Sequence, residues 1–173
     1  GLPGEDSLRG RGVAYRATCD GGFYRGKAVA VAGGGNSAAE DALTLSKLCK
    51  KVYLIHRRDT LSATRSYLKP LEKAENIEFL WNRQVTGFDV DGTLTGLTLT
   101  DTKTGEESHL PVDGLFVAIG RQPNTWLVKG QLELDRQGYI VADESCRTSQ
   151  PGVFAIGDVR TKPLRQVVTA VAD

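Results

Sequence analysis

The sequence predicts an α/β protein in which apolar strands alternate with helices around a parallel sheet, and two observations carry that prediction. An apolar run over residues 27–32 leads into three consecutive glycines, and a helical pattern begins at Asn36. A second apolar run, residues 52–55, follows that pattern and ends in the strongest basic cluster of the chain. Strand, glycine-rich turn, helix and second strand in this order are typical of a Rossmann-like, three-layer βαβ architecture.

The other elements follow from the spacing of apolar residues along the chain. Residues 1–26 are rich in Gly and Arg and are predicted to be loop. Pro70 is expected to kink or break the second helix, because proline lacks the N–H that a helix interior needs. An alternation with a period of two around Asp91-Gly92 predicts an antiparallel meander inserted before the last parallel strand. The predicted strands span 27–32, 51–55, 77–81, 85–90, 94–99, 108–111 and 114–120, and the predicted helices span 36–49 and 61–75.

The pattern changes near Pro123, and we place a domain boundary there. Residues 132–141 are expected to hold a short hairpin, and a helix is expected to start near Gln166 and to run to the end of the chain. The missing initiator Met and the missing stop signal of this helix favour a processed chain or a fragment. We therefore predict one domain over residues 1–123 and an incomplete second domain over residues 124–173.

The composition is that of an ordinary globular protein and narrows the range of partners. The chain has 173 residues, of which 40% are hydrophobic and 25% are charged, and its formal net charge is +1. A charge so close to zero gives no general signal for nucleic acid or for a membrane surface, and no apolar stretch is long enough to cross a bilayer. Three widely spaced cysteines fit a reducing compartment, so we expect a cytoplasmic protein without a metal site.

The glycine-rich turn has the residue types that a dinucleotide pyrophosphate requires. Gly33, Gly35 and Ala38 fit the spacing Gly-x-Gly-x-x-Gly/Ala. The first Gly permits a tight turn, the second lets the backbone approach the pyrophosphate, and the small third residue lets the helix pack closely on the strand. Asn36 or Ser37 can cap the helix or donate to a phosphate oxygen. The alternative is a strand–helix turn whose glycines serve packing alone.

The residues at the end of the second strand distinguish between the two nicotinamide cofactors. NAD-binding units place an Asp or Glu about 20 residues beyond the glycines, where it holds the ribose 2′-hydroxyl. This chain has His56, Arg57 and Arg58 at that place. An acid would repel a 2′-phosphate, whereas a guanidinium can hold it with two hydrogen bonds, so the cluster favours NADPH. The alternative is a solvated basic turn.

An ordered set of motifs covers nearly the whole chain and resembles the low-molecular-weight, bacterial-type thioredoxin reductases. The set comprises residues 1–5, 17–21, 31–38, 56–59, 114–120, 123–125, 151–158 and 165–166. The resemblance implies two Rossmann-like domains, with an NADPH domain inserted into an FAD domain. It also implies that this chain holds the complete NADPH insert and part of the second FAD half, and that the first FAD half lies outside it.

The resemblance assigns the matched residues to an NADPH site and to an FAD site. The family usually has a further Arg about three residues after Asp59, and Ser62 stands there, so Arg65 from the next turn is the candidate replacement. The implied assignments are Gly33, Gly35, Asn36, Ser37 and Ala38 for the NADPH pyrophosphate; His56, Arg57 and Arg58 for the 2′-phosphate; Ile119 and Gly120 for the nicotinamide side; Gly157 and Asp158 for the FAD ribityl and phosphate groups; and Arg165, Gln166 and Val167 for the flavin ring.

One residue departs from the redox motif of that family. The motif is Cys-Ala-Thr-Cys followed by Asp, and here Arg16 replaces its first Cys, while Cys19 and Asp20 are present. Disulfide reduction needs one thiolate to attack and a second to resolve the mixed disulfide, so Cys19 by itself can form a mixed disulfide but cannot release it. By resemblance, Cys19 is the thiol that faces the flavin and Asp20 is the general acid.

These observations lead to one functional hypothesis and two alternatives. The leading hypothesis is part of an NADPH-dependent flavoprotein disulfide reductase, which passes a hydride from NADPH to FAD and electrons on to a disulfide such as that of thioredoxin. We expect FAD in a full-length parent, a homodimer formed through the FAD domain, and no thioredoxin reduction by this chain alone. The alternatives are an NADPH-binding module without redox chemistry and a dithiol-free relative that reduces ferredoxin, flavodoxin or another flavoprotein.

Overall fold

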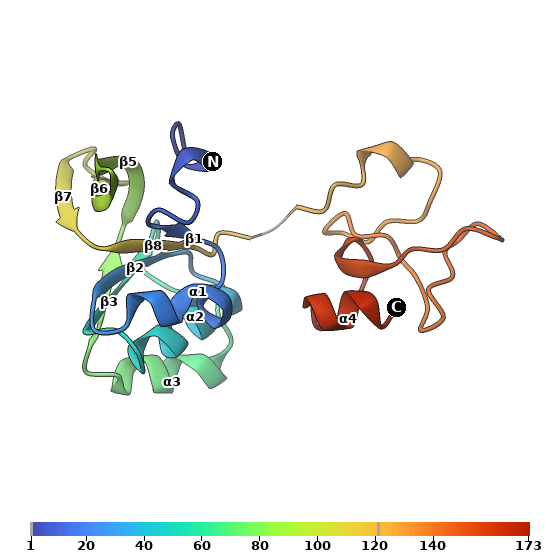
Figure 1. Cartoon of the computed structure of the whole chain (residues 1–173), viewed down its shortest axis with the longest axis horizontal. Coiled ribbons are helices and arrows are strands. Elements are labelled where there is room, and N and C mark those ends of the chain that lie inside the picture. Colours follow the sequence, from blue (N-terminus) through green and yellow to red (C-terminus); the bar gives the residue numbers. More distant parts are fainter. Residues whose placement is uncertain (1, 121) are drawn as a thin grey trace. The chain divides into compact units, whose positions relative to one another are not determined.

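The computed structural model describes residues 2–120 and 122–173. The chain divides into two compact units, Gly1–Gly120 and Arg121–Asp173 (Figure 1). The division falls close to the boundary expected at Pro123. The assignment of a function to each side of that boundary stays a prediction.

The first unit is built on a five-stranded parallel sheet in the order β1-β8-β2-β3-β4. The unit's first and last strands therefore lie side by side, although about 100 residues of sequence separate them. The central strand β2 pairs with β3 on one side and with β8 on the other. The strands are β1 (Val13–Ala14), β2 (Ala28–Ala32), β3 (Lys51–His56), β4 (Ile77–Trp81) and β8 (Gly114–Val117).

The meander predicted from the period of two is confirmed as a three-stranded antiparallel sheet in the order β5-β6-β7. Gly92 joins the first two strands with a φ of +67°, a left-handed conformation that glycine adopts without strain. Irregularities in β5 shift its register against β6, and such bulges bend a hairpin and increase its twist. The strands are β5 (Arg83–Asp91), β6 (Thr93–Asp101) and β7 (Glu107–Pro111).

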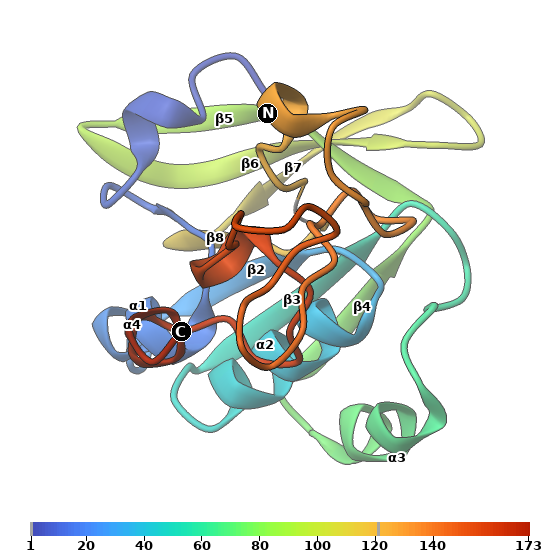
Figure 2. The same ribbon diagram turned by 90° about the vertical axis from the view of Figure 1, so that its right-hand side faces the viewer.

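The first unit has three layers, with helices on one face of the parallel sheet and the antiparallel sheet on the other (Figure 2). Val29 and Val31 of β2 belong to the core cluster on the helical face, whereas Ala30 belongs to the cluster under the antiparallel sheet. Successive side chains of a strand point to opposite faces, so an unbroken apolar run suits a sheet covered on both sides. The helices are α1 (Ala17–Asp20), α2 (Asn36–Ser46) and α3 (Arg65–Lys73), with short 3-10 helices η1 (Asp6–Leu8) and η2 (Gly21–Tyr24).

The second unit has little regular structure and is organised around a buried cation. The Arg160 guanidinium donates to the Asp143 carbonyl oxygen at 2.8 Å and to the Asp173 carboxylate at 2.9 Å. The Lys162 ammonium donates to the same carboxylate at 2.6 Å. A buried charge is tolerated when it is paired and hydrogen-bonded in this way. The unit contains η3 (Trp126–Val128), η4 (Gly157–Val159) and α4 (Val167–Val171).

The N-terminal segment was the largest error of the sequence-based prediction. Residues 1–26 are not all loop, because they contain β1, α1, η1 and η2. β1 has only two residues, and it is a strand because Val13 and Ala14 pair with β8 from the far end of the unit. A pairing over such a distance leaves no local periodicity in the sequence, so pattern reading missed it.

Other element boundaries also differ from the prediction. The helix predicted over residues 61–75 begins at Arg65 and continues through Pro70, with Leu71 fully buried against the core. The last parallel strand ends at Val117, and the hairpin predicted near residues 132–141 is reduced to isolated bridges. Across the described residues, no helix has both the length and the apolar character needed to cross a membrane.

The packing between Gly114 and Tyr24 yields a stability prediction. A Cβ at Gly114 would lie 2.3 Å from the Tyr24 ring, which itself packs edge-on against Phe116 at 5.2 Å between centroids. Gly114→Ala is therefore expected to lower the free energy of unfolding by about 1–3 kcal/mol, as overpacking of a core does. Urea unfolding followed by circular dichroism measures the change. Gly22→Ala is the control, since a Cβ there has no atom within 4 Å; equal midpoints for the two variants would contradict the prediction.

Candidate dinucleotide-binding site

A cavity of about 790 Å³ opens at the carboxyl ends of the parallel strands of the first unit. The glycine turn after β2, the residues after β3 and β8, the beginning of β5 and the N-terminal segment form its walls. Ligands of parallel α/β sheets bind at this edge, because strand ends and helix N-termini both point there. The sequence-predicted residues that line the cavity are Gly33, Gly35, Asn36, Ser37, His56, Arg57, Arg58, Ile119 and Gly120.

Gly33 occupies a position that no other residue can take without displacing the backbone. Its φ is +151°, and a Cβ there would lie 2.4 Å from the Ala118 carbonyl oxygen and 2.9 Å from the Ala38 Cβ. Its N–H donates to the Ile55 carbonyl oxygen at 3.0 Å, which ties the turn to the end of β3. Ala38 is fully buried beneath the turn, so its role in the structure is the close packing of α2 on the sheet.

Gly34 is the turn residue whose importance the sequence did not reveal. A Cβ there would lie 2.2 Å from the His56 imidazole, so the ring covers this position. The Gly34 carbonyl oxygen accepts hydrogen bonds from the Ser62 N–H at 2.8 Å, the Ser62 hydroxyl at 3.1 Å and the Ala63 N–H at 3.1 Å. These three hydrogen bonds hold the turn to the segment that precedes α3. At Gly35, by contrast, a Cβ would have the Ser62 Oγ, 3.9 Å away, as its nearest neighbour, so the backbone there faces open space.

The N-terminus of α2 faces the cavity, as an anion site requires. Helix α2 begins at Asn36, and no side chain caps it. Asn36 uses its Oδ1 to accept the Thr64 N–H at 2.8 Å, which joins the start of α2 to the segment before α3. The first N–H groups of a helix have no partner within the helix, and the helix dipole is positive at this end. Gly35, Asn36 and Ser37 therefore form a backbone cradle suited to phosphate.

The two arginines after β3 are exposed, while their backbone is held by the residues just before β5 and just after β6. The Arg57 carbonyl oxygen accepts the Thr102 hydroxyl at 3.0 Å, and the Arg58 carbonyl oxygen accepts the Asn82 N–H at 3.2 Å. Both side chains line the cavity. Because their backbone is anchored and their guanidinium groups are exposed, the two arginines are suited to bind a phosphate at the edge of the cavity.

His56 sits between the arginines and the glycine turn, and its environment disfavours its charged form. Burial lowers the pKa of the imidazole, and the neighbouring positive charges of Arg58 and Arg57 lower it further. The ring stands edge-on to Trp81 with 6.5 Å between centroids. His56 is therefore a neutral, packed ring at neutral pH, and the cationic character of this end of the cavity comes from the two guanidinium groups.

Ser62, which stands where the family usually has a further Arg, is hydrogen-bonded to the glycine turn. Ser62 lines the cavity and is bonded to Gly34 through both its N–H and its hydroxyl. Arg65 is exposed at the first position of α3 and is not among the lining residues of the described chain. Arg57 and Arg58 are thus the two guanidinium groups that the segment after β3 contributes to the lining of the cavity.

Several lining residues were missed by sequence reasoning. Arg83, Gln84 and Phe88 come from β5, and Glu5 comes from the N-terminal segment. Arg83 is paired with Asp101, which directs its charge toward a protein carboxylate. No local signal identifies these residues, because the folding of the meander over the parallel sheet brings them to the cavity. Glu5 belongs to a recognised motif, but the motif by itself gave it no role.

The redox-motif residues lie on the short helix α1. Arg16 is the N-cap residue, and its carbonyl oxygen accepts the N–H groups of Cys19 at 3.2 Å and Asp20 at 3.0 Å. The buried Ala17 N–H donates to Asp41 Oδ1 at 3.0 Å and anchors the loop to α2. Cys19 is exposed, so its thiol is accessible to a disulfide in solution.

The two remaining cysteines are buried in separate units. Cys49 packs in the core beside α2, and burial raises the pKa of its thiol, with a further contribution from Asp113. Cys146 is buried in the second unit, although the sequence around it is polar. Among the residues that the structure describes, no group of three or more His, Cys, Asp or Glu side chains is placed to hold a metal ion.

The residues expected at an FAD site all lie in the second unit. The Gly157 N–H donates to Asp173 Oδ2 at 2.6 Å, and the Arg165 guanidinium donates to the Asp158 carbonyl oxygen at 3.3 Å. Gln166 caps α4 through a reciprocal capping box with Thr169, and Val167 at the first turn is largely exposed. The structure therefore brings these residues together around η4 and the start of α4.

The whole chain, residues 1–173, matches the pyridine nucleotide-disulphide oxidoreductases, and the chain belongs to this family. Within it the similar proteins are thioredoxin reductases, which confirms the resemblance drawn from the motifs. That of Streptomyces clavuligerus is 48% identical over 171 residues, covering 98% of this chain and 53% of the relative. That of Listeria monocytogenes is 46% identical over 177 residues, covering 100% of this chain and 54% of the relative.

Solved structures agree with this assignment. The crystal structure of thioredoxin reductase from Streptococcus pyogenes superposes with a TM-score of 0.89 at 39% identity, covering 100% of this chain and 57% of that one. The predicted α/β fold, with its parallel sheet and antiparallel meander, is therefore confirmed. The chain spans about half the length of the curated relatives that it matches.

The glycine turn yields a prediction that separates its first and third glycines. Gly33→Ala is expected to lower the free energy of unfolding by about 2–3 kcal/mol, because the new Cβ meets backbone and the φ is strained. Gly35→Ala is expected to change it by less than about 0.5 kcal/mol, because its φ of −91° suits any residue and the space is open. Chemical unfolding of both variants is the measurement, and equal losses at the two positions would refute it.

Proposed function

We propose that this chain forms the NADPH-binding part of a thioredoxin-reductase-type flavoprotein, with the cofactor held by the domain predicted over residues 1–123. One observation carries the proposal. A single cavity at the carboxyl edge of the sheet combines an uncapped helix N-terminus, an open glycine at Gly35 and two guanidinium groups after β3. The first two suit a pyrophosphate, and the third suits the 2′-phosphate that distinguishes NADPH from NADH.

The residues present fit this cofactor. Gly35, Asn36 and Ser37 would hold the pyrophosphate through backbone N–H groups, and Arg57 and Arg58 would hold the 2′-phosphate. His56 would pack as a neutral ring between them. When bound, NADPH supplies a hydride, and the chain's own residues bind it, orient it and exclude water from it.

The second unit is proposed to contribute to an FAD site in the whole protein. Gly157 and Asp158 would meet the ribityl and phosphate groups, and Arg165, Gln166 and Val167 would line the flavin ring. The close grouping of these residues around η4 and α4 supports this assignment. Residues 124–173 would then be part of the FAD-binding domain, paired with sequence that the longer relatives possess.

The whole protein is proposed to pass electrons from NADPH through FAD to a disulfide, with thioredoxin or a similar protein as partner. It is proposed to be a cytoplasmic homodimer that binds neither nucleic acid nor membrane. In this chain, Arg16 replaces the attacking thiol of the motif, so Cys19 can take part in one exchange step only. Asp20, next to it on α1, is proposed to manage protons at that thiol.

A second candidate function follows from the same replacement. With Arg16 in the motif, the whole protein would bind NADPH and flavin but reduce an acceptor other than a dithiol substrate, such as ferredoxin, flavodoxin or another flavoprotein. A further alternative is that the protein binds NADPH and carries out no redox chemistry. Reduction of thioredoxin by the full-length protein favours the first function, and a flavin-containing protein inactive toward thioredoxin favours the second.

The two arginines give the direct test of cofactor choice. The double variant Arg57→Gln with Arg58→Gln is expected to weaken NADPH binding by about 100-fold and NADH binding by less than about threefold, because only the 2′-phosphate loses its charge-assisted hydrogen bonds. Titration can be followed by the fluorescence of Trp81, which lies beside His56.

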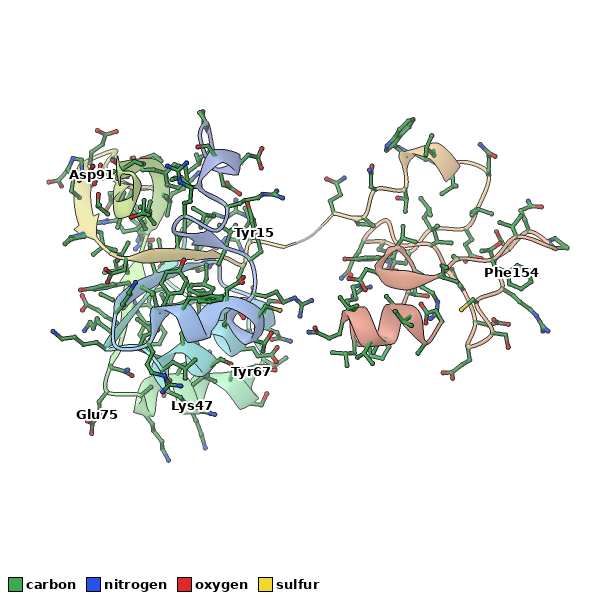
Figure 3. The ribbon with its side chains drawn as sticks, viewed as in Figure 1. Tyr15, Lys47, Tyr67, Glu75, Asp91 and Phe154 are labelled. Atoms are coloured by element: carbon green, nitrogen blue, oxygen red, sulfur yellow. The ribbon has the colours of Figure 1, made fainter. Side chains whose placement is uncertain are left out.

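Lys47→Gln is the matched control for the loss of positive charge. Lys47 is exposed at the far end of α2 from the glycine turn, on the helical side of the unit (Figure 3). It is expected to leave both affinities unchanged. Equal affinity of the unaltered chain for NADH and NADPH would overturn the assignment of the arginines.

The redox loop gives a second test, based on stoichiometry. An aryl disulfide reagent should transfer one aryl thiol group to Cys19 and release one coloured thiolate, and the mixed disulfide should persist. In Arg16→Cys the introduced thiol lies three residues before Cys19 across the first turn of α1, a separation compatible with a disulfide. It should attack the mixed disulfide and release the second thiolate.

The expected readout is one fast equivalent of thiolate for the unaltered chain and two for Arg16→Cys. Cys19→Ser should show no fast release, because Cys49 and Cys146 are buried. A fast second equivalent from the unaltered chain would show that another thiol reaches Cys19 and would refute the single-thiol assignment.

A further inference from the structure

The order of the strands fixes the order of chemical groups along the cavity. From β3 to β1 the sheet runs β3, β2, β8, β1, with neighbouring strands about 4.8 Å apart. The arginines follow β3, the glycine turn follows β2, and Ile119 and Gly120 follow β8. Tyr15 follows β1, next along the edge. A dinucleotide with its 2′-phosphate at Arg57 and Arg58 and its pyrophosphate at Gly35 therefore points its nicotinamide toward β8 and β1.

Glu5 is the acid at that end of the cavity, and it is held in place from two sides. Its Oε1 accepts the Tyr15 hydroxyl at 2.7 Å, and its Oε2 accepts the Leu2 N–H at 3.0 Å. Glu5 also lines the cavity. Each carboxylate oxygen can accept a second hydrogen bond, so the pinned group keeps capacity for a ligand.

Part of the lining of the cavity that holds Glu5 is apolar, which strengthens the electrostatic effect of its carboxylate. Leu2, Phe88 and Val117 line the cavity and pack against the core cluster under the antiparallel sheet. Tyr15 packs against the same cluster, and Figure 3 shows it on the side of the parallel sheet opposite Lys47. Apolar walls suit a planar nicotinamide ring and lower the local dielectric constant, so a charge there acts with less screening than in water.

The carboxyl group is ionised at neutral pH. Burial acts to raise the pKa of Glu5, but the hydrogen bonds from Tyr15 and Leu2, together with nearby positive charges that include Arg9, lower it overall. The Arg9 guanidinium lies 4.9 Å from the centroid of the Tyr15 ring, and this cation–π contact helps to hold Tyr15 in place beside Glu5.

On these grounds we propose that Glu5 is a specificity-determining residue that reads the redox state of the nicotinamide. The inference rests on the proposed NADPH site. The oxidised ring carries a positive charge and the reduced ring is neutral, so a fixed carboxylate beside it binds NADP⁺ more tightly than NADPH. The same preference favours departure of a hydride from the bound cofactor, because the charge that develops on the ring is stabilised.

The test compares three ligands by calorimetry on the full chain. Glu5→Gln is expected to weaken NADP⁺ binding on the order of tenfold and NADPH binding by less than about threefold, the size expected for loss of one charge pair a few ångströms apart. Binding of 2′,5′-ADP, which has the phosphates but no nicotinamide, is expected to stay within about twofold, since it reports on the arginine end alone.

Two further variants separate charge from structure. Asp6→Asn removes the neighbouring acid, which is 90% exposed and paired with Arg9, and it should leave the NADP⁺ to NADPH affinity ratio unchanged. Tyr15→Phe removes one hydrogen bond to Glu5 but keeps its charge, and it should keep the NADP⁺ preference even if all affinities fall together.

The outcomes distinguish this inference from the proposed function. Failure of the unaltered chain to bind 2′,5′-ADP would overturn the proposed NADPH site itself. Normal 2′,5′-ADP binding with an unchanged NADP⁺ to NADPH ratio in Glu5→Gln would overturn the role of Glu5 and leave the site intact.

Discussion

The architecture of the site depends on how closely three pieces of backbone approach one another at the carboxyl edge of the parallel sheet. Gly33 lies against the Ala118 carbonyl group and Ala38, and Gly34 lies under the His56 imidazole. These contacts join the ends of β2, β3 and β8 to the start of α2. A side chain at Gly33 would meet the Ala118 backbone and force these pieces apart, and a side chain at Gly34 would have to displace the His56 ring.

The redox loop shows how structure can persist where chemistry is altered. Its fold rests on backbone groups, namely the Arg16 carbonyl oxygen, which accepts two N–H groups, and the Ala17 N–H, which donates to Asp41. None of these bonds requires a thiol at position 16. The chain can therefore carry Arg16 without losing α1, although a dithiol cycle needs two sulfur atoms for every disulfide reduced.

Much of the fold was predictable because its signals are local. The run from β2 through α2 to β3 and the long hairpin of β5 and β6 each carry their own periodicity and turn residues. β1 was missed because two residues carry no period, and their strand character comes from pairing with β8. The same distinction holds in the site. Gly33, Arg57 and Arg58 follow from a motif, whereas Gly34 acquires its constraint from a ring that arrives from another strand.

The sequence by itself determined the class of the protein, the glycine turn with its basic partner after the next strand, and the replacement of a redox cysteine by Arg16. These are matters of residue identity and short spacing, which the chain carries whatever its conformation. Only the tertiary structure decided that β5 and the N-terminal segment line the cavity, and that the Tyr15 hydroxyl holds Glu5 there. Contacts between segments far apart in sequence arise from the packing of layers on the sheet, and no local pattern records them.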